Sequence, residues 1–284
     1  MKPSSLLIGL MTAVVLICPA ISRGETAQQA FERGDRLVAQ SDFREALQAH
    51  AAAVRADRSN QEYIQRFMLV RQIILLRANL DQERDFQRWY RTAKSLRSFY
   101  VSEGIYSEAL LVDKRLHAKM NSASSAAQLA ETQLAMGKNA DAAQVLEALG
   151  PSKGTANTQA LLCIALAKQG QTSEAREIAA GIAPSDSADT GTLYSLARMH
   201  AVVGNHDQAL STLTRCFEGV PPSRLDDFRS HASESPEFAA LASTDGFAEA
   251  LETKSKVVES QCSAGSSCSG CPMRGQCPSS GDGR

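Results

Sequence analysis

The sequence predicts an all-α fold of stacked helix pairs, and a repeated spacing of small residues is the main reason. Gly104, Gly137, Gly170 and Gly204 follow one another at intervals of 33, 33 and 34 residues, and each is followed five residues later by an alanine. A unit of two helices that stacks on copies of itself has this length. The hydrophobic fraction of 43% is sufficient for a continuous core. We therefore expect a stack of helix pairs.

Each small residue has a physical role in such a pair. A glycine at the end of the first helix can take the left-handed conformation that terminates it. An alanine early in the second helix lets two helix axes approach closely. The alanines at this place are Ala46, Ala109, Ala142, Ala175 and Ala209. An earlier copy of the unit begins near residue 27, where Gly34 occupies the small position within the first helix, and Phe43 and Ala46 occupy their expected places in the second.

At these residues the chain resembles the tetratricopeptide repeat family, and the resemblance implies a right-handed superhelical solenoid over residues 25–223. Five repeats match the pattern, and the apolar run between the first two is interpreted as a sixth, degenerate repeat. The matching repeats are 27–60, 90–123, 123–156, 156–189 and 190–223, and the degenerate one is 61–89. After Pro221 and Pro222, residues 224–257 resemble the closing helices that such arrays need, because the last unit must present a polar outer face.

The resemblance also implies where a partner would bind, because the first helix of each repeat in this family lines a concave groove. A polypeptide, either an extended peptide or a helix, is the expected ligand. Lys94 matches one position of the family's carboxylate clamp, but Ser98 does not match the next, so that clamp is not predicted. The groove positions carried onto this chain are Phe31, Asp35, Val38, Arg91, Lys94, Ser98, Val101, Glu131, Leu134, Ile164, Lys168, Tyr194 and Arg198.

Residues 1–24 have the features of a secretory signal peptide. Lys2 provides a positive start, Leu6 to Cys18 forms an apolar stretch, and small residues follow at Ala20 and Ser22. We expect export to the periplasm or the exterior, removal of this segment, and no membrane attachment afterwards. An uncleaved anchor and lipid attachment at Cys18 are the alternatives, although Ile17 is not the small residue that usually precedes a lipidated cysteine.

Residues 258–284 form a tail rich in Ser, Gly and Cys that cannot build a core without cross-links. An even set of cysteines in an exported protein favours two disulfides. A tetrahedral zinc site, an iron–sulfur cluster and thiol exchange are alternatives. The cysteines concerned are Cys262, Cys268, Cys271 and Cys277. In contrast, Cys163 and Cys216 occupy repeat positions where small apolar side chains pack, so we expect them in the core.

The remaining features favour binding over catalysis. The sequence contains no nucleophile elbow, phosphate-binding loop, dinucleotide fingerprint or paired-histidine metal motif. Lys and Arg predominate between Arg55 and Lys119, and Asp and Glu predominate beyond Asn121, but no nucleic-acid-binding framework accompanies the basic part. The sequence therefore predicts an exported, non-enzymatic scaffold for a polypeptide partner. The alternative is an accessory protein that handles metal or thiol redox chemistry through its tail.

Overall fold

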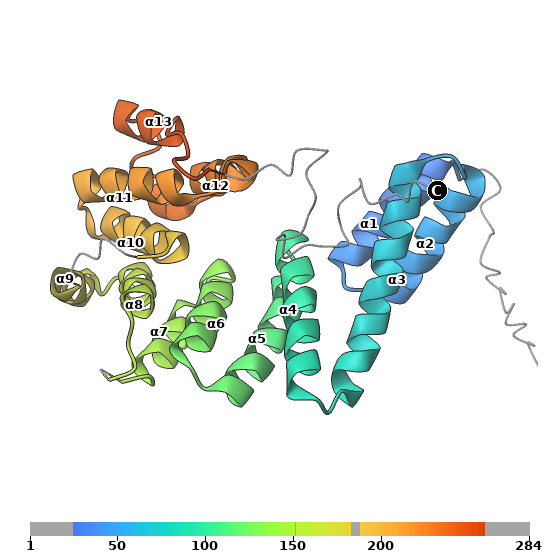
Figure 1. Ribbon diagram of the computed structural model, residues 1–284, viewed down its shortest axis with the longest axis horizontal. Coiled ribbons are helices and arrows are strands. Elements are labelled where there is room, and N and C mark those ends of the chain that lie inside the picture. Colours follow the sequence, from blue (N-terminus) through green and yellow to red (C-terminus); the bar gives the residue numbers. More distant parts are fainter. Residues whose placement is uncertain (1–24, 151, 183–187, 259–284) are drawn as a thin grey trace, which may run out of the picture. The chain divides into compact units, whose positions relative to one another are not determined.

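The computed structural model describes residues 25–150, 152–182 and 188–258, and all regular secondary structure among them is helical (Figure 1). The all-α prediction is confirmed. The helices are α1 (Ala27–Ala39), α2 (Phe43–Ala56), α3 (Gln61–Gln82), α4 (Phe86–Ser102), α5 (Tyr106–Met120), α6 (Ala123–Ala135), α7 (Asn139–Glu147), α8 (Ala156–Lys168), α9 (Thr172–Gly181), α10 (Thr190–Val203), α11 (His206–Gly219), α12 (Pro222–Glu234) and α13 (Asp245–Leu251), with a 3-10 helix, η1, at Pro236–Phe238.

The chain divides into two compact units, Met1–Ile105 and Tyr106–Arg284. The division falls in the turn between α4 and α5, inside the predicted repeat 90–123. The predicted signal peptide and the cysteine tail lie outside the described residues. None of the described helices combines the length and the hydrophobicity that crossing a membrane requires.

The turn glycines adopt the conformation that their spacing predicts. Gly104, Gly137, Gly170 and Gly204 have φ angles of 69°, 71°, 83° and 87°, in the left-handed region that glycine enters without a steric penalty. In the first helix pair the equivalent turn uses Ser41, with φ of 65°. Each of these residues ends one helix and lets the next turn back, which accounts for the helix-pair architecture.

The first unit contains the largest departure from the predicted organisation. Residues 61–89 do not form a shortened helix pair, because Gln61–Gln82 is one continuous helix of 22 residues. Asn60 caps its start by accepting hydrogen bonds from the backbone amides of Glu62 and Tyr63. No glycine or proline interrupts the following run of apolar residues, so nothing in the chain ends the helix before Glu83.

Helices α2, α3 and α4 share an aromatic core in the first unit. The ring of Phe43 on α2 lies 6.1 Å from that of Phe99 and 6.0 Å from that of Tyr100, both on α4. The guanidinium of Arg77 on α3 lies 4.8 Å from the Phe43 ring centre and donates a hydrogen bond to the Tyr100 hydroxyl. Aromatic packing of this kind contributes beyond the area that it buries, and it holds α4 in place.

The second unit stacks its helices in sequence. Helix α6 packs against α5 and α7, α8 packs against α7 and α9, and α10 packs against α11. The first helices of successive pairs also contact one another, α6 with α8 and α8 with α10. Helix α13 packs on α11 and η1 packs on α10. Ala142, Ala175 and Ala209 are fully buried in this unit, as close helix approach at these positions requires.

The two cysteines that the structure describes behave as core residues, which confirms the prediction for Cys163 and Cys216. Both are free and fully buried. Burial raises the pKa of each thiol to about 12, so neither side chain is a reactive thiolate near neutral pH. The Cys216 Sγ atom donates to the backbone carbonyl of Thr190 at 3.2 Å.

Candidate functional site

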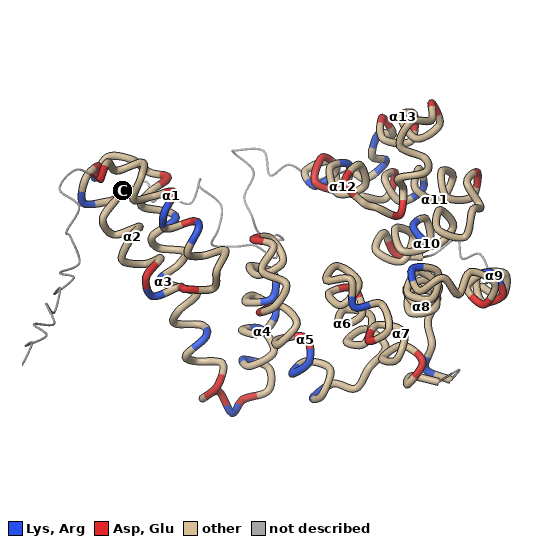
Figure 2. Tube along the Cα trace, turned by 180° about the vertical axis from the view of Figure 1, so that it is seen from behind, with Lys and Arg blue, Asp and Glu red and all other residues tan. Residues whose placement is uncertain are grey.

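The exposed face of α4 brings together three of the predicted groove residues. Arg91, Lys94 and Ser98 are all exposed, while Val101, one turn further along, is half-buried. Their spacing of three and four residues places them on one side of the helix. Helix α4 contains no Asp or Glu, and its Lys and Arg positions are distributed along its length (Figure 2). The first unit therefore presents a basic helix face to solvent.

Opposite this face, α4 is firmly anchored. Trp89, Leu96 and Tyr100 are almost completely buried. The Asp85 side chain caps the helix by accepting a hydrogen bond from the backbone amide of Arg88 at 2.8 Å. A helix that is fixed on one side and exposed on the other can hold its surface side chains at constant spacing.

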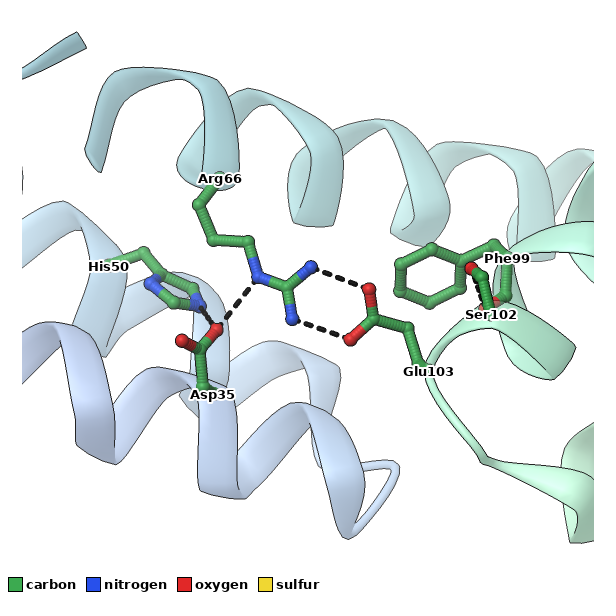
Figure 3. A network of polar contacts seen from close by, with 6 residues as sticks. All are labelled: Asp35, His50, Arg66, Phe99, Ser102 and Glu103. Atoms are coloured by element: carbon green, nitrogen blue, oxygen red, sulfur yellow. Dashed lines mark hydrogen bonds and ion pairs between the residues drawn. The ribbon is translucent and has the colours of Figure 1, made fainter. Parts of the chain in front are cut away.

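A second polar cluster in the same unit has an internal, structural role. The guanidinium of Arg66 on α3 donates to Asp35 on α1 at 2.7 Å and makes a bidentate pair with Glu103 at 2.7 and 2.6 Å (Figure 3). Hydrogen bonds to both carboxylates raise the pKa of Arg66 further above its usual value, with the bonds to Glu103 as the main cause. The cluster connects α1 and α3 to the end of α4. Asp35, one of the predicted groove residues, is therefore already paired with Arg66 inside the unit.

His50 lies beside this cluster and is completely buried. Its Nε2 atom points toward the Asp35 carboxylate (Figure 3), at a distance of 3.6 Å, and its ring packs edge-on against Phe31 at 5.4 Å. Neither ring nitrogen has a hydrogen-bond partner among the described residues. Burial lowers the pKa of His50, partly opposed by Asp35 and reinforced by Arg66. The imidazole is therefore neutral at physiological pH.

We expect the protein to lose stability as the pH falls below about 6.5, the ordinary pKa of histidine in an unfolded chain. Because the pKa of His50 is lower in the folded state, the unfolded state binds more protons in this range and is favoured as the pH falls. Urea unfolding at about pH 7.5 and pH 5.5 measures the effect. The variant His50→Leu should reduce the difference without removing it, since burial also lowers the pKa of His200. An unchanged difference would exclude His50 as a cause.

In the second unit, two predicted groove residues, Lys168 and Arg198, pair with the carboxylate of Glu237, and a third, Tyr194, lies beside Arg198. Glu237 in η1 receives Lys168 Nζ at 2.5 Å and Arg198 Nη2 at 3.3 Å, from α8 and α10. The Ser235 hydroxyl donates to the same carboxylate at 2.5 Å. The Tyr194 hydroxyl is 2.7 Å from His231 Nδ1, and its ring lies 5.8 Å from the Arg198 guanidinium.

The environment of Glu237 fixes its ionisation. Its side chain is only 2% exposed. Burial opposes ionisation, but Arg198 and the hydrogen bonds from Lys168 and Ser235 outweigh burial and lower the pKa of Glu237 to about 2. The cluster is therefore a buried ion pair that fastens the closing segment onto α8 and α10. Lys168, Tyr194 and Arg198 have internal partners here and are less available to a ligand than the residues of α4.

The other predicted groove residues differ in accessibility. Phe31, Val38, Leu134 and Ile164 are buried in helix contacts, and Glu131 is exposed on α6. The four tail cysteines lie outside the described residues. Among the residues that the structure describes, no group of His, Cys, Asp and Glu side chains could hold a metal ion. Among the described residues, α4 is the helix on which several predicted groove residues share one exposed face. The cations of that face, Arg91 and Lys94, have no ion-pair partner among the described residues.

No family model matches the sequence, and no curated protein matches it. Among solved structures, the chain is similar to a thermophilic TPR protein from Thermus thermophilus, at 18% identity and a TM-score of 0.36, over 80% of this chain and 99% of the other. It is similar to a tetratricopeptide repeat protein from Parabacteroides merdae at 14% identity and a TM-score of 0.40, over 81% and 99%.

A third solved structure is YrrB, described as a TPR protein with an unusual peptide-binding site. The identity is 17% and the TM-score 0.31, over 74% of this chain and 93% of YrrB. The class of the present protein rests on its own residues: it is an all-α protein built from helix pairs whose turns are closed by left-handed glycines.

Proposed function

We propose that this protein is a non-enzymatic scaffold that binds a polypeptide partner through the exposed face of α4. The observation that carries the proposal is the combination of exposed Arg91, Lys94 and Ser98 on one side of a helix without acidic residues. The buried side of that helix, with Trp89 and Tyr100, keeps the face in a fixed position. Rigid helices that present evenly spaced side chains suit recognition of an extended peptide or a partner helix.

The proposal predicts that reversing the charge of the face will release the partner. The double variant Arg91→Glu and Lys94→Glu should capture the partner at least about tenfold less well from an extract of the native cells, because opposite charges become like charges. Quantitative mass spectrometry of the captured proteins measures the loss, and circular dichroism confirms that the helices remain. The matched control is Arg44→Glu with Arg58→Glu, two exposed residues of the same unit outside α4. Equal loss in the control would contradict the assignment.

We further propose that the chain is exported to the periplasm or the exterior and that its tail is cross-linked there. The support comes from the sequence of residues 1–24 and from the four cysteines of residues 258–284. In protein isolated from its native compartment, Cys262, Cys268, Cys271 and Cys277 should resist alkylation until a reductant is added. Peptide mass spectrometry tests this directly. Free tail thiols with stoichiometric zinc or iron would instead favour the metal-handling function.

A further inference from the structure

Helix α4 exposes two cations, Arg91 and Lys94, on one side. In the part of the chain that the structure describes, no carboxylate lies within ion-pair distance of Arg91 or Lys94. Arg91 Nε donates a hydrogen bond to the Gln87 carbonyl of its own helix at 3.4 Å. Arg88, in contrast, pairs with Glu83 at 3.3 Å and lies 3.8 Å from Asp85. The charge available to a ligand is therefore concentrated at Arg91 and Lys94.

An aromatic row borders this charge on one flank of the helix. Phe86 is 45% exposed although it is a large apolar residue. Its ring stacks on those of Trp89, at 6.2 Å, and Tyr90, at 6.1 Å. The Lys94 ammonium lies 5.6 Å from the Tyr90 ring centre. Phe86, Tyr90 and Lys94 are four residues apart and so lie one above another on the same flank. Stacking holds the Phe86 ring in place while leaving part of it open to an apolar ligand group.

The other flank of α4 contains an open hollow of about 380 Å³ between the end of α3 and the start of α4. Arg91 stands at the junction of this hollow and the exposed face. The hollow combines guanidinium, amide and hydroxyl donors with a single carboxylate. Its lining residues are Asn79, Gln82, Glu83, Arg88, Arg91 and Thr92. Such donors can accept a carboxylate or a backbone carbonyl of a bound chain.

From this arrangement we propose that the α4 face binds an acidic linear peptide segment with one aromatic or large apolar anchor residue. The carboxylates of the segment pair with Arg91 and Lys94, and the anchor packs on Phe86 and Tyr90. This inference rests on the proposed function and adds the chemistry of the partner. Charge complementarity supplies steering and specificity, and the apolar anchor supplies contact area that exposed ion pairs alone do not provide.

A peptide fits this face better than a continuous polyanion does. Glu83 and Asp85 precede α4 and lie beside Arg88, and Glu103 follows it and pairs with Arg66, so the charges at both ends of the face already neutralise one another. A nucleic acid or an anionic membrane would bring phosphates to all of these positions at once. A peptide can place its carboxylates opposite Arg91 and Lys94 alone and keep neutral residues elsewhere.

Fluorescence anisotropy with the full chain and defined probes tests the inference. The first probe is a labelled peptide of about twelve residues with several Glu and Asp around one Trp, long enough to span the face. Matched probes replace every acidic residue with Gln or Asn, or replace Trp with Ala. Labelled single-stranded poly(dT) and phosphatidylserine vesicles complete the set. We expect the acidic Trp peptide to bind most tightly, and its affinity to fall as salt rises from about 50 to 500 mM.

Variants assign the binding to α4. Arg91→Glu with Lys94→Glu should weaken binding of the acidic Trp peptide at least about tenfold, and Phe86→Ala about threefold or more. Arg44→Glu with Arg58→Glu should leave it unchanged. Equal affinity for the neutral peptide, no binding of the acidic peptide, or tighter binding to poly(dT) or vesicles would overturn the inference. If those results occur while charge reversal still releases the cellular partner, the scaffold function stands and only the acidic-peptide chemistry is wrong.

Discussion

Replacing Glu237 with alanine is expected to lower the free energy of unfolding by about 3–5 kcal/mol, the usual cost of removing one member of a buried ion pair. The substitution leaves Arg198 and Lys168 without their carboxylate, and Arg198 has only 11% of its side chain exposed. It also removes the acceptor of the Ser235 hydroxyl. Urea or thermal unfolding, read by circular dichroism, measures the loss.

The control for this experiment is Glu234→Ala, which removes an exposed carboxylate three residues earlier. Its effect should stay within about 0.5 kcal/mol, as for most surface substitutions. The stabilisation by Glu237 should also depend on pH with a defined sign. Because the folded pKa is lowered from 4.5 to about 2, the stabilisation is complete above about pH 4.5 and is lost as the pH falls toward 2. A loss below about 1 kcal/mol at neutral pH would show that the cluster does not hold the closing segment.

Gly34→Ala should destabilise the protein by about 1–3 kcal/mol through overpacking, although Gly-to-Ala replacement inside a helix normally stabilises by about 1 kcal/mol. Gly34 lies within α1, and a β-carbon there would be 2.5 Å from His50 Cε1 and 2.7 Å from both ring nitrogens. The ring cannot retreat easily, because it is fully buried and packs against Phe31. The sign of the change therefore tests the contact between α1 and α2.

A second background isolates the cause of this effect. In a His50→Ala protein the obstacle is gone, so adding Gly34→Ala should now stabilise by about 1 kcal/mol, as helix propensity predicts. The difference between the two backgrounds is the coupling between the positions. If Gly34→Ala destabilises both proteins equally, the clash with the His50 ring is not the cause of the destabilisation.

The parts of the fold that were predictable from sequence depend on local chemistry. Gly137 and Gly170 mark turns because a left-handed backbone there favours glycine, and Ala142 and Ala175 mark close helix contacts because they are small. Because every helix pair has the same two requirements, these glycines and alanines recur in the sequence at a nearly constant spacing. Ser41 fills the same turn without glycine, so that turn had to be inferred from its neighbours. The single long helix α3 was missed because repeat spacing favoured another pair, whereas nothing local ends a helix within residues 61–82.

The candidate site was less predictable, because it depends on contacts between distant positions. Arg198 and Glu237 are 39 residues apart in sequence, and no local pattern joins them. The repeat register assigned Val38 and Ile164 to an open groove, but neighbouring helices bury both completely. In contrast, the exposure of Arg91 and Lys94 was predictable, because both lie on the polar side of an amphipathic helix.

The central claim is that the exposed face of α4 holds a polypeptide partner, and site-specific photo-cross-linking in the native cells tests it most directly. A photoreactive residue replaces Ser98 on α4 in one variant and Gln48 on α2 in another, both exposed positions of the same unit. We expect a discrete cross-linked polypeptide from position 98 that disappears when Arg91→Glu and Lys94→Glu are added, and none from position 48. The same product from both positions, or its persistence after charge reversal, would contradict the claim.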